Sequence, residues 1–267
     1  MRHKTFVFLA TIAASVIAIG ACSGPPGRHV APAQSGSGRL IVILIDNSGS
    51  TVGERRTGLY TKIVTELATG LEPGDRIVAG VINDHSHLFE PIVHETLPHV
   101  SENSSFFSIS YWSGSGPMAE EVKRKHEAAE LEAEKAQIAQ ALAAAAGSKD
   151  KAPNTCICAA IEVVATQYLL TWSGQKFVVI LSDGIEDCQG LVLGPGIPTQ
   201  RLTLGLRSRL PDLHGVIAYF AGLSTSSPSR FRTNQQIWQS VLADSGADVC
   251  QQHMGYDPPL RELRSCK

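Results

Sequence analysis

Two kinds of segment alternate along most of the chain. Short, uninterrupted runs of branched apolar residues occur at 40–45 and 177–181, and such runs are typical of strands buried on both faces of a parallel sheet. Longer stretches with a helical spacing of apolar residues stand between them. The pattern therefore predicts an α/β fold, with a doubly wound, mostly parallel sheet, helices on both of its faces and one extended helix.

The expected strands and helices follow one another in a regular order. Strands are predicted at 40–45, 76–82, 88–93, 177–181 and 215–221. Helices are predicted at 51–70, 117–146, 155–170 and 233–245. The strand at 88–93 is short and is expected to pair with the strand before it. A helix between two strands is the usual connection that leaves them parallel in one sheet.

The helix predicted at 117–146 is unusually long. At 1.5 Å per residue it would reach about 45 Å, and its middle consists mostly of Glu, Lys and Ala. Its apolar residues are sparse: Val122, Leu131, Ile138 and Leu142. Two interpretations remain open, a solvated helix that projects from the body, or a helix that docks a partner or associates with itself.

The first residues form a processing signal. A positive start at 2–4 precedes an apolar run at 5–19 that is too short for a comfortable membrane span. The small residues Gly20 and Ala21 then stand directly before Cys22. This arrangement resembles the lipobox of bacterial lipoproteins, and the resemblance implies cleavage before Cys22 and acylation of its thiol. The alternatives are an ordinary secretory signal with an incidental cysteine, or a short amino-terminal anchor.

The predicted organisation has four parts. They are a lipoprotein signal peptide at 1–21, a flexible tether at 22–38, an α/β domain at 39–249 and a C-terminal tail at 250–267. The tether is rich in Ser, Gly and Pro, a composition that buries little surface. Such a protein is expected in the cell envelope, lipid-anchored to a membrane on its periplasmic or extracellular face.

Composition and charge narrow the range of partners. The chain has 267 residues, of which 43% are hydrophobic and 18% charged, an ordinary composition for one sizeable core or two small ones. Its formal net charge is -2. A nucleic-acid partner is not expected, because a phosphate backbone requires a concentrated basic patch and Lys123–Lys125 is flanked by glutamates.

Polar residues that suit a hard metal ion follow two of the apolar strands. One strand runs into Asp46-Asn47-Ser48-Gly49-Ser50 and another into Ser182-Asp183-Gly184, while a third polar loop, Asn154-Thr155, opens a helix. In an open parallel sheet, ligands bind at the carboxyl ends of the strands. Carboxylates and hydroxyls suit Mg²⁺, Mn²⁺ or Ca²⁺ rather than a soft metal. Two carboxylates leave such an ion under-neutralised, so a partner's Asp or Glu is expected as a further ligand.

These residues resemble the metal-ion-dependent adhesion site of von Willebrand factor type A domains. The loop at 46–50 matches the family's Asp-x-Ser-x-Ser pattern, Asp183-Gly184 matches its second acidic loop, and Thr155 stands where the family has a threonine. The segment at 72–76 and Trp238 also look like that family. The resemblance implies a divalent cation, Mg²⁺ foremost with Mn²⁺ or Ca²⁺ as alternatives, and as its ligands Asp46, Ser48, Ser50, Thr155 and Asp183.

Six cysteines are present, and acylation of the first would leave five. Pairing is expected because an exported protein meets oxidising conditions. Cys250 is expected to pair with Cys266 across the tail. Cys188 is expected to pair with Cys156 or Cys158, whose loops the predicted sheet brings together at the metal edge. The alternative is a soft-metal or redox site of Cys156, Cys158 and Cys188, although no histidine has a spacing that completes a zinc set.

The expected function is binding rather than catalysis, because no sequence typical of a catalytic nucleophile, phosphate loop or zinc protease is present. The protein would bind a protein partner through the metal and the partner's acidic side chain, and a membrane through its N-terminal lipid. One alternative is an assembly or chaperone-like component of an envelope complex that uses the helix at 117–146 and has a structural metal. Another is a redox or hydrolytic enzyme at the cysteine-rich edge. The histidines at 84–87 are expected in a polar loop.

Overall fold

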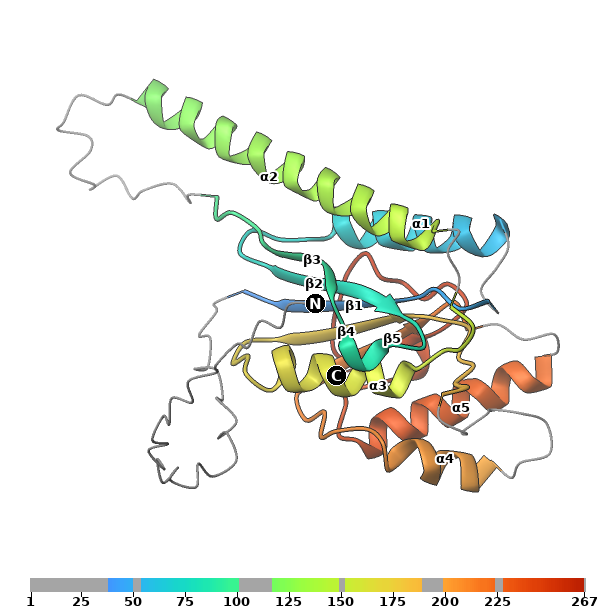
Figure 1. Ribbon diagram of the computed structural model, residues 1–267. Coiled ribbons are helices and arrows are strands. Elements are labelled where there is room, and N and C mark those ends of the chain that lie inside the picture. The colour runs from blue at the N-terminus through green and yellow to red at the C-terminus, as the bar shows by residue number, and fades with distance from the viewer. Residues whose placement is uncertain are drawn as a thin grey trace, which may run out of the picture. The chain divides into compact units, whose positions relative to one another are not determined.

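The computed structural model describes residues 38–49, 54–100, 117–148, 152–188, 199–223 and 228–266 (Figure 1). All of them belong to a unit that spans 33–267. The signal peptide at 1–21, the lipidation candidate Cys22 and the tether up to residue 37 lie outside the described residues. Ser50 and the loop at 101–116 lie outside them as well. What the sequence predicts for these segments therefore stays a prediction.

A six-stranded sheet forms the middle layer, in the order β3-β2-β1-β4-β5-β6. The strands are β1 (Leu40–Asp46), β2 (Arg76–Ile82), β3 (Pro91–Thr96), β4 (Lys176–Leu181), β5 (Val216–Ala221) and β6 (Met254–Gly255). Neighbouring strands are parallel, except that β3 is antiparallel to β2. The apolar runs of β1 and β4 are buried almost throughout, because helices cover both faces of the sheet. The prediction of a doubly wound, mostly parallel α/β sheet is thus confirmed.

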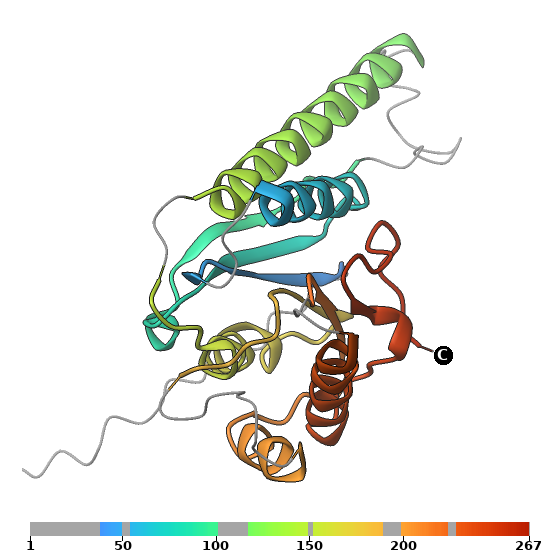
Figure 2. The same cartoon turned by 90° about the vertical axis from the view of Figure 1, so that its right-hand side faces the viewer.

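The helices lie in two outer layers. α1 (Glu54–Thr69) and α2 (Pro117–Ala146) cover one face of the sheet (Figures 1 and 2). The other face carries α3 (Ile157–Val164), which continues as a short π-helix, together with α4 (Thr199–Arg207) and α5 (Pro228–Asp244). Successive residues of a strand point to opposite faces. Leu44 of β1 accordingly lies in one hydrophobic core and Ile45 in the other.

Some element boundaries differ from the sequence-based prediction. β3 begins at Pro91 rather than at 88, because Ser86–Leu88 form a short 3₁₀-helix before it. Proline is acceptable as the first residue of an edge strand, where no backbone donor is required. α5 begins at Pro228 rather than at 233. The sequence pattern does not indicate α4, which contains Gly205, or β6, which has only two residues.

α2 has the predicted bounds, and its two halves differ in their surroundings. Leu131, Ile138 and Leu142 are buried in the core that α2 shares with α1, whereas Val122 is 65% exposed. The amino-terminal end of α2 extends past the edge of the sheet (Figure 1). A projecting helix therefore describes its first half, while the sparse apolar residues of its second half complete the core. Among the described residues, no helix is both long and apolar enough to cross a membrane.

Candidate metal centre

The two predicted aspartate loops meet at the carboxyl ends of β1 and β4, the two central strands of the sheet. β1 and β4 are neighbours, and the chain proceeds from β1 toward β2 on one side and from β4 toward β5 on the other. Such a reversal of strand order opens a crevice at the carboxyl ends of the two strands, where ligands of α/β sheets bind. Asp46 is the last residue of β1, and Ser182 and Asp183 directly follow β4. The topology thus brings both carboxylates to one edge.

The carboxylate of Asp46 is buried and accepts hydrogen bonds from Ser48 and Ser182. The backbone N–H of Ser48 donates to its Oδ1 at 2.8 Å, and the hydroxyl of Ser182 donates to its Oδ2 at 2.6 Å. Burial raises the pKa of Asp46 to about 6, and the nearby charge of Asp183 adds to this effect. A cation beside Asp46 would reverse the effect of burial by stabilising the ionised carboxylate.

Asp183 lies at the start of a tightly packed turn. Its Oδ1 accepts from the backbone N–H of Ile185 at 3.0 Å, and its Oδ2 accepts from Nη1 of Arg56 on α1, also at 3.0 Å. Gly184 follows with a φ of +82°, and a β-carbon there would lie 2.6 Å from Cδ2 of Leu223. The indole Nε1 of Trp238 donates to the Gly184 carbonyl at 2.9 Å. The turn is therefore fixed from the α1 side and from the α5 side.

The threonine loop lies between the two aspartate loops. Ala152 N–H donates to the carbonyl of Asn47 at 2.9 Å, and Gly49 N–H donates back to the Ala152 carbonyl at 3.0 Å. At the other end of the loop, Thr155 and Asp187 exchange two hydrogen bonds, one of them from Asp187 N–H to the Thr155 carbonyl at 3.2 Å. Five ligands were predicted, and Ser50 is outside the described residues. The structure brings together the loops that carry the other four, namely Asp46, Ser48, Thr155 and Asp183.

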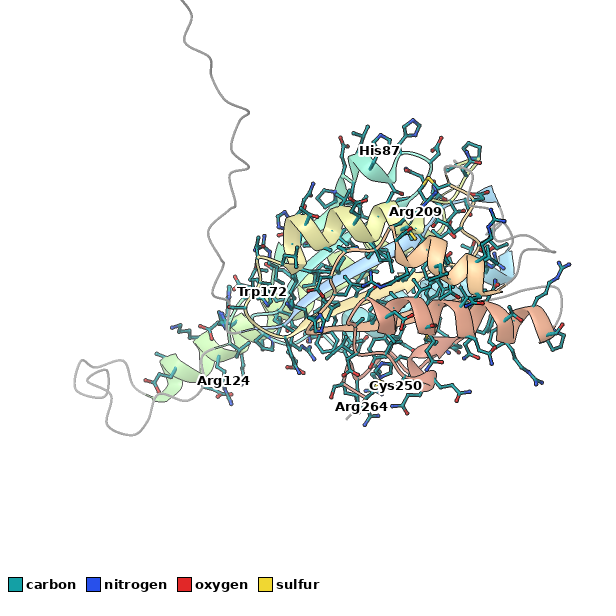
Figure 3. The ribbon with its side chains drawn as sticks, turned by 90° about the horizontal axis from the view of Figure 1, so that it is seen from below. His87, Arg124, Trp172, Arg209, Cys250 and Arg264 are labelled. Carbon is teal, nitrogen blue, oxygen red and sulfur yellow. A yellow bond between two sulfur atoms is a disulfide. The ribbon has the colours of Figure 1, made fainter. Side chains whose placement is uncertain are left out.

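A disulfide and a buried carboxylate hold this edge together. Cys156, just before α3, is bonded to Cys188, so the expected bridge of Cys188 is confirmed and its partner is Cys156. Glu186 is fully buried and accepts from the backbone N–H of Cys158 at the start of α3, at 3.1 Å. Burial raises the pKa of Glu186 to about 7. Arg209 adds a hydrogen bond from Nη1 to the Cys188 carbonyl at 3.1 Å, and Figure 3 shows it beside the loop.

Cys158 is free and buried, and burial raises the pKa of its thiol well above the ordinary value. A buried, protonated thiol is a poor metal ligand and a poor nucleophile. With Cys156 and Cys188 already bonded to each other, this oxidised edge does not offer three thiolates to a soft metal. His87 lies in the short 3₁₀-helix before β3 and is exposed, as expected for the polar connection between β2 and β3 (Figure 3).

Two residues of α1 that the sequence analysis did not single out face the same edge. Arg56 pairs with Asp183, and Tyr60 stands one helical turn further on. The Tyr60 hydroxyl is buried and has no hydrogen-bond partner within the described residues. The hydroxyl lies near Gly222, which follows β5: a β-carbon built on Gly222 would be 2.9 Å from the Tyr60 hydroxyl oxygen. Burial and then the charge of Asp46 raise the pKa of Tyr60 well above its ordinary value. The i, i+4 spacing of Arg56 and Tyr60 puts both on one helix face, which is the signal that could have revealed them.

The chemistry of this edge fits a hard divalent cation. Its donors are all oxygens, from the carboxylates of Asp46 and Asp183 and from neighbouring hydroxyls. Mg²⁺ commonly takes one or two carboxylates and keeps several waters. The unpartnered hydroxyl of Tyr60 is the observation that calls for a further polar group, because a buried hydroxyl without a partner is unfavourable. A water held by the ion would satisfy it.

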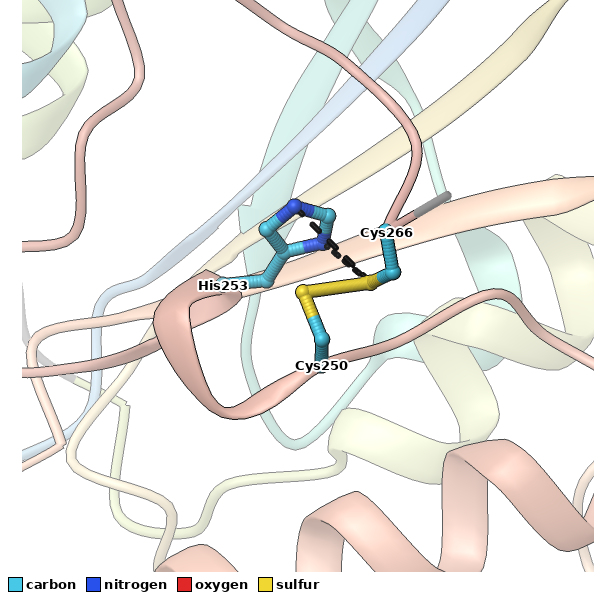
Figure 4. Close-up of side chains that lie close together, drawn as sticks. All are labelled: Cys250, His253 and Cys266. Carbon is cyan, nitrogen blue, oxygen red and sulfur yellow. Dashed lines mark hydrogen bonds between the residues drawn. A yellow bond between two sulfur atoms is a disulfide. The ribbon is translucent and has the colours of Figure 1, made fainter.

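A second group of potential ligands lies in the tail, where Cys250, His253 and Cys266 come within 4.8 Å of one another (Figure 4). The two cysteines form the predicted disulfide. Sγ of Cys266 lies 3.5 Å from Nδ1 and 4.0 Å from Nε2 of His253, so it lies along neither nitrogen lone pair. The ring of His253 stacks on Tyr219 at 3.9 Å. This group therefore fastens the tail to β5 rather than presenting ligands.

No protein-family profile matches the chain, and no curated protein sequence matches it either. Proximal thread matrix protein 1 from the mussel byssus has a similar fold, with a TM-score of 0.42 and 12% identity over 85% of this chain and 43% of that one. In one structure of the mussel protein, zinc occupies its MIDAS motif. The manganese-loaded TRAP protein of Plasmodium vivax has a TM-score of 0.43 and 12% identity with this chain. The match covers 82% of this chain and 68% of that one.

A von Willebrand factor type A protein from Catenulispora acidiphila gives a TM-score of 0.40 and 12% identity, over 77% of this chain and 43% of that one. This chain spans less than half the length of the mussel and Catenulispora proteins. At this level of similarity, no property of those proteins transfers to this chain.

Proposed function

We propose that the edge formed by the three loops binds a divalent metal ion, Mg²⁺ foremost, and that the ion binds an acidic side chain of a protein partner. The observation that carries this proposal is the meeting of Asp46 and Asp183 at the topological switch point, among hydroxyl oxygens and beside the unpartnered hydroxyl of Tyr60. Ser48, Ser50 and Thr155 would supply further oxygens.

The charges at the edge favour an anionic partner. Asp46 and Asp183 carry two negative charges and Arg56 carries one positive charge. A divalent ion would offset both carboxylates, and an open coordination position on it would attract a carboxylate from another protein. This edge would bind a ligand rather than transform one, because a bound carboxylate would complete the ion's coordination.

The predicted lipid anchor would hold this function at a membrane. Acylation of Cys22 and the tether at 22–38 would hold the body at the periplasmic or extracellular face. Replacement of Cys22 by serine should release the protein from the membrane fraction. Retention of that variant in the membrane would contradict lipid anchoring and leave metal binding unaffected.

The direct test uses the full chain as bait in membrane extract, with Mg²⁺ or with a chelator. Capture of a defined partner should require Mg²⁺ and should be lost in Asp46→Asn, which retains the size of the side chain. Asp212→Asn removes the same charge at an exposed position and should retain capture. Capture that persists both in chelator and in Asp46→Asn would overturn the proposal.

One observation favours a second candidate, an assembly component of an envelope complex in which the metal is structural. The first half of α2 extends from the body, and Val122 on it is 65% exposed. If this helix is the main contact, Val122→Glu should abolish capture while chelation leaves it intact. The opposite pattern favours the metal-dependent function.

A further inference from the structure

Arg56 occupies one side of the proposed metal site. It stands in the first turn of α1, and its Nη1 lies 3.0 Å from Oδ2 of Asp183. The two side chains are 18% and 2% exposed, so the ion pair is largely shielded from water. The other carboxylate oxygen, Oδ1, accepts from Ile185 N–H. The metal-free fold therefore has its own cation at this carboxylate.

A guanidinium and a divalent ion cannot both lie close to Asp183 without strong repulsion. In a partly buried site, like charges a few ångströms apart repel each other more strongly than they would in water, because the surroundings screen them less. Entry of the ion therefore favours withdrawal of Arg56. Because its side chain is long and partly exposed, the guanidinium can turn toward water while its methylene groups stay against the protein.

A second arginine shows what a purely structural ion pair looks like in this chain. Arg39 binds Asp75 through both Nε and Nη2, at 3.0 and 2.5 Å, and also donates to the carbonyl of Gly70. That pair lies at the amino end of β1, at the opposite edge of the sheet. Arg56, in contrast, binds Asp183 through Nη1 at the edge that offers oxygen ligands, one turn before the unpartnered Tyr60 hydroxyl.

We propose that Arg56 is a built-in competitor of the metal ion: it neutralises Asp183 in the metal-free protein and gives up that carboxylate when the ion binds. The metal affinity of the site is then set by Arg56 as well as by the ligands. This inference rests on the proposed metal site and adds a residue that regulates it. It also explains how a buried pair of carboxylates remains stable when metal is scarce.

The test is a titration of Mg²⁺ and Mn²⁺ into the detergent-solubilised full chain by calorimetry. Tryptophan fluorescence serves as a second readout, because Trp238 donates to the Asp183–Gly184 turn. Arg56→Gln should bind the ions about tenfold more tightly, a change of about 1.4 kcal/mol. Arg56→Lys retains the charge on a shorter side chain, so its ion affinity should lie between those of the wild type and Arg56→Gln. Lys62→Gln is the control, because Lys62 is on the same helix but pairs with Asp257 and Glu66.

Thermal unfolding distinguishes competition from a simple structural role. In chelator, Arg56→Gln should melt at a lower temperature than the wild type, because Asp183 loses its counter-charge. Added Mg²⁺ should raise the melting temperature of Arg56→Gln by more than that of the wild type. If the ion pair were purely structural, Arg56→Gln would show the same lower melting temperature in chelator. Mg²⁺ would then raise that temperature no more than it does in the wild type.

The outcomes separate this inference from the function on which it rests. Equal or weaker ion binding by Arg56→Gln, with binding by the wild type that is lost in Asp46→Asn, would overturn the role of Arg56 alone. Absence of ion binding in both the wild type and Arg56→Gln would overturn the metal site and the inference together. Tighter binding by Arg56→Gln, with Lys62→Gln unchanged within about twofold, supports the competition.

Discussion

At the scale of single residues, Ser182 joins the two aspartate loops through one hydroxyl. Its Oγ donates to the carboxylate of Asp46 and accepts from the backbone N–H of Gly184 at 3.1 Å. Ser182 is fully buried, so the loss of either hydrogen bond would be unfavourable because water could not replace the lost partner. A displacement of either loop is therefore transmitted to the other through this hydroxyl.

The conformation of Gly184 gives a stability prediction with a matched control. Gly184→Ala should destabilise the protein by about 2 kcal/mol or more, because its φ is +82° and the new methyl would lie 2.6 Å from Leu223. Gly58→Ala, on α1 with no atom within 4 Å of the added carbon, should stabilise it by about 0.5–1 kcal/mol. Urea unfolding measures both. Equal effects of the two variants would contradict the strained turn.

The buried carboxyl of Glu186 predicts a pH dependence. Because burial raises its folded-state pKa from 4.5 to about 7, the folded protein binds the proton more tightly than the unfolded chain does. Stability from this group is therefore fully present below the ordinary pKa and is lost as the pH rises through about 7. Glu186→Gln should be more stable than the wild type at about pH 8, by up to about 3 kcal/mol.

That advantage of Glu186→Gln should shrink as the pH falls toward 5, where the wild-type carboxyl is protonated in the folded state. The measurement is the free energy of unfolding in urea at a series of pH values. Glu162→Gln, at an exposed position on α3, serves as the charge-matched control. A constant difference between Glu186→Gln and the wild type across this range would show that the group does not titrate as expected.

At the scale of elements, the beginning of α3 is attached to the loop after β4 in several ways. The Cys156–Cys188 disulfide, the Thr155–Asp187 hydrogen bonds and the Glu186 carboxylate all join these two segments. Two segments that are far apart in sequence thus behave as one rigid edge. The edge could position ligands without a further ordering cost when an ion enters.

Loss of the Cys156–Cys188 bond should loosen this edge. The double variant Cys156→Ser/Cys188→Ser should lose about 2–4 kcal/mol of stability, because the bond closes a long loop in the unfolded chain. Denaturant unfolding under non-reducing conditions measures the loss. Cys158→Ala retains the bond, and peptide mapping should show its disulfide-linked peptide altered only by the mass of the substitution. A double variant as stable as the wild type would show that the hydrogen bonds alone hold the edge.

At the scale of the whole molecule, the strand order decides where the polar edge forms. The strand order reverses between β1 and β4, which are parallel, so the carboxyl ends of these two strands lie side by side at one edge of the sheet. Asp46 and Asp183 are more than a hundred residues apart in sequence, and the topology makes them neighbours through Ser182. Ion binding at this edge would therefore stabilise the native fold as a whole.

Linkage gives the size of that stabilisation. At an ion concentration about one hundred times Kd, binding to the folded state alone should add about 2.7 kcal/mol to the free energy of unfolding. The melting temperature should rise with Mg²⁺ concentration and return to its starting value in chelator. Asp46→Asn should abolish the rise, and Asp212→Asn should leave it unchanged. A melting temperature that does not depend on Mg²⁺ in the wild type would contradict the metal site.

Local sequence was sufficient for the main elements and for the position of the polar edge. The run at 40–45 contains only branched apolar residues, so its strand had to be buried on both faces. Aspartates after β1 and β4 then had to lie at the carboxyl edge of a parallel sheet. The bounds of α2 could be predicted because a helix pattern depends on residues three and four positions apart.

Other features depended on packing between distant segments, and here the sequence alone was insufficient. Cys156 and Cys158 were equal candidates for Cys188, but Cys156 precedes α3 and bonds to the loop, whereas Cys158 lies within α3 and packs in the core. β6 has two residues and exists only because β5 offers an unpaired edge. The approach of Arg56 and Tyr60 to Asp183 likewise depends on how α1 packs on the sheet. The sequence by itself determined where the polar edge lies, because strand ends follow from local pattern, while the tertiary structure decided which side chains from other elements face that edge, because this depends on packing.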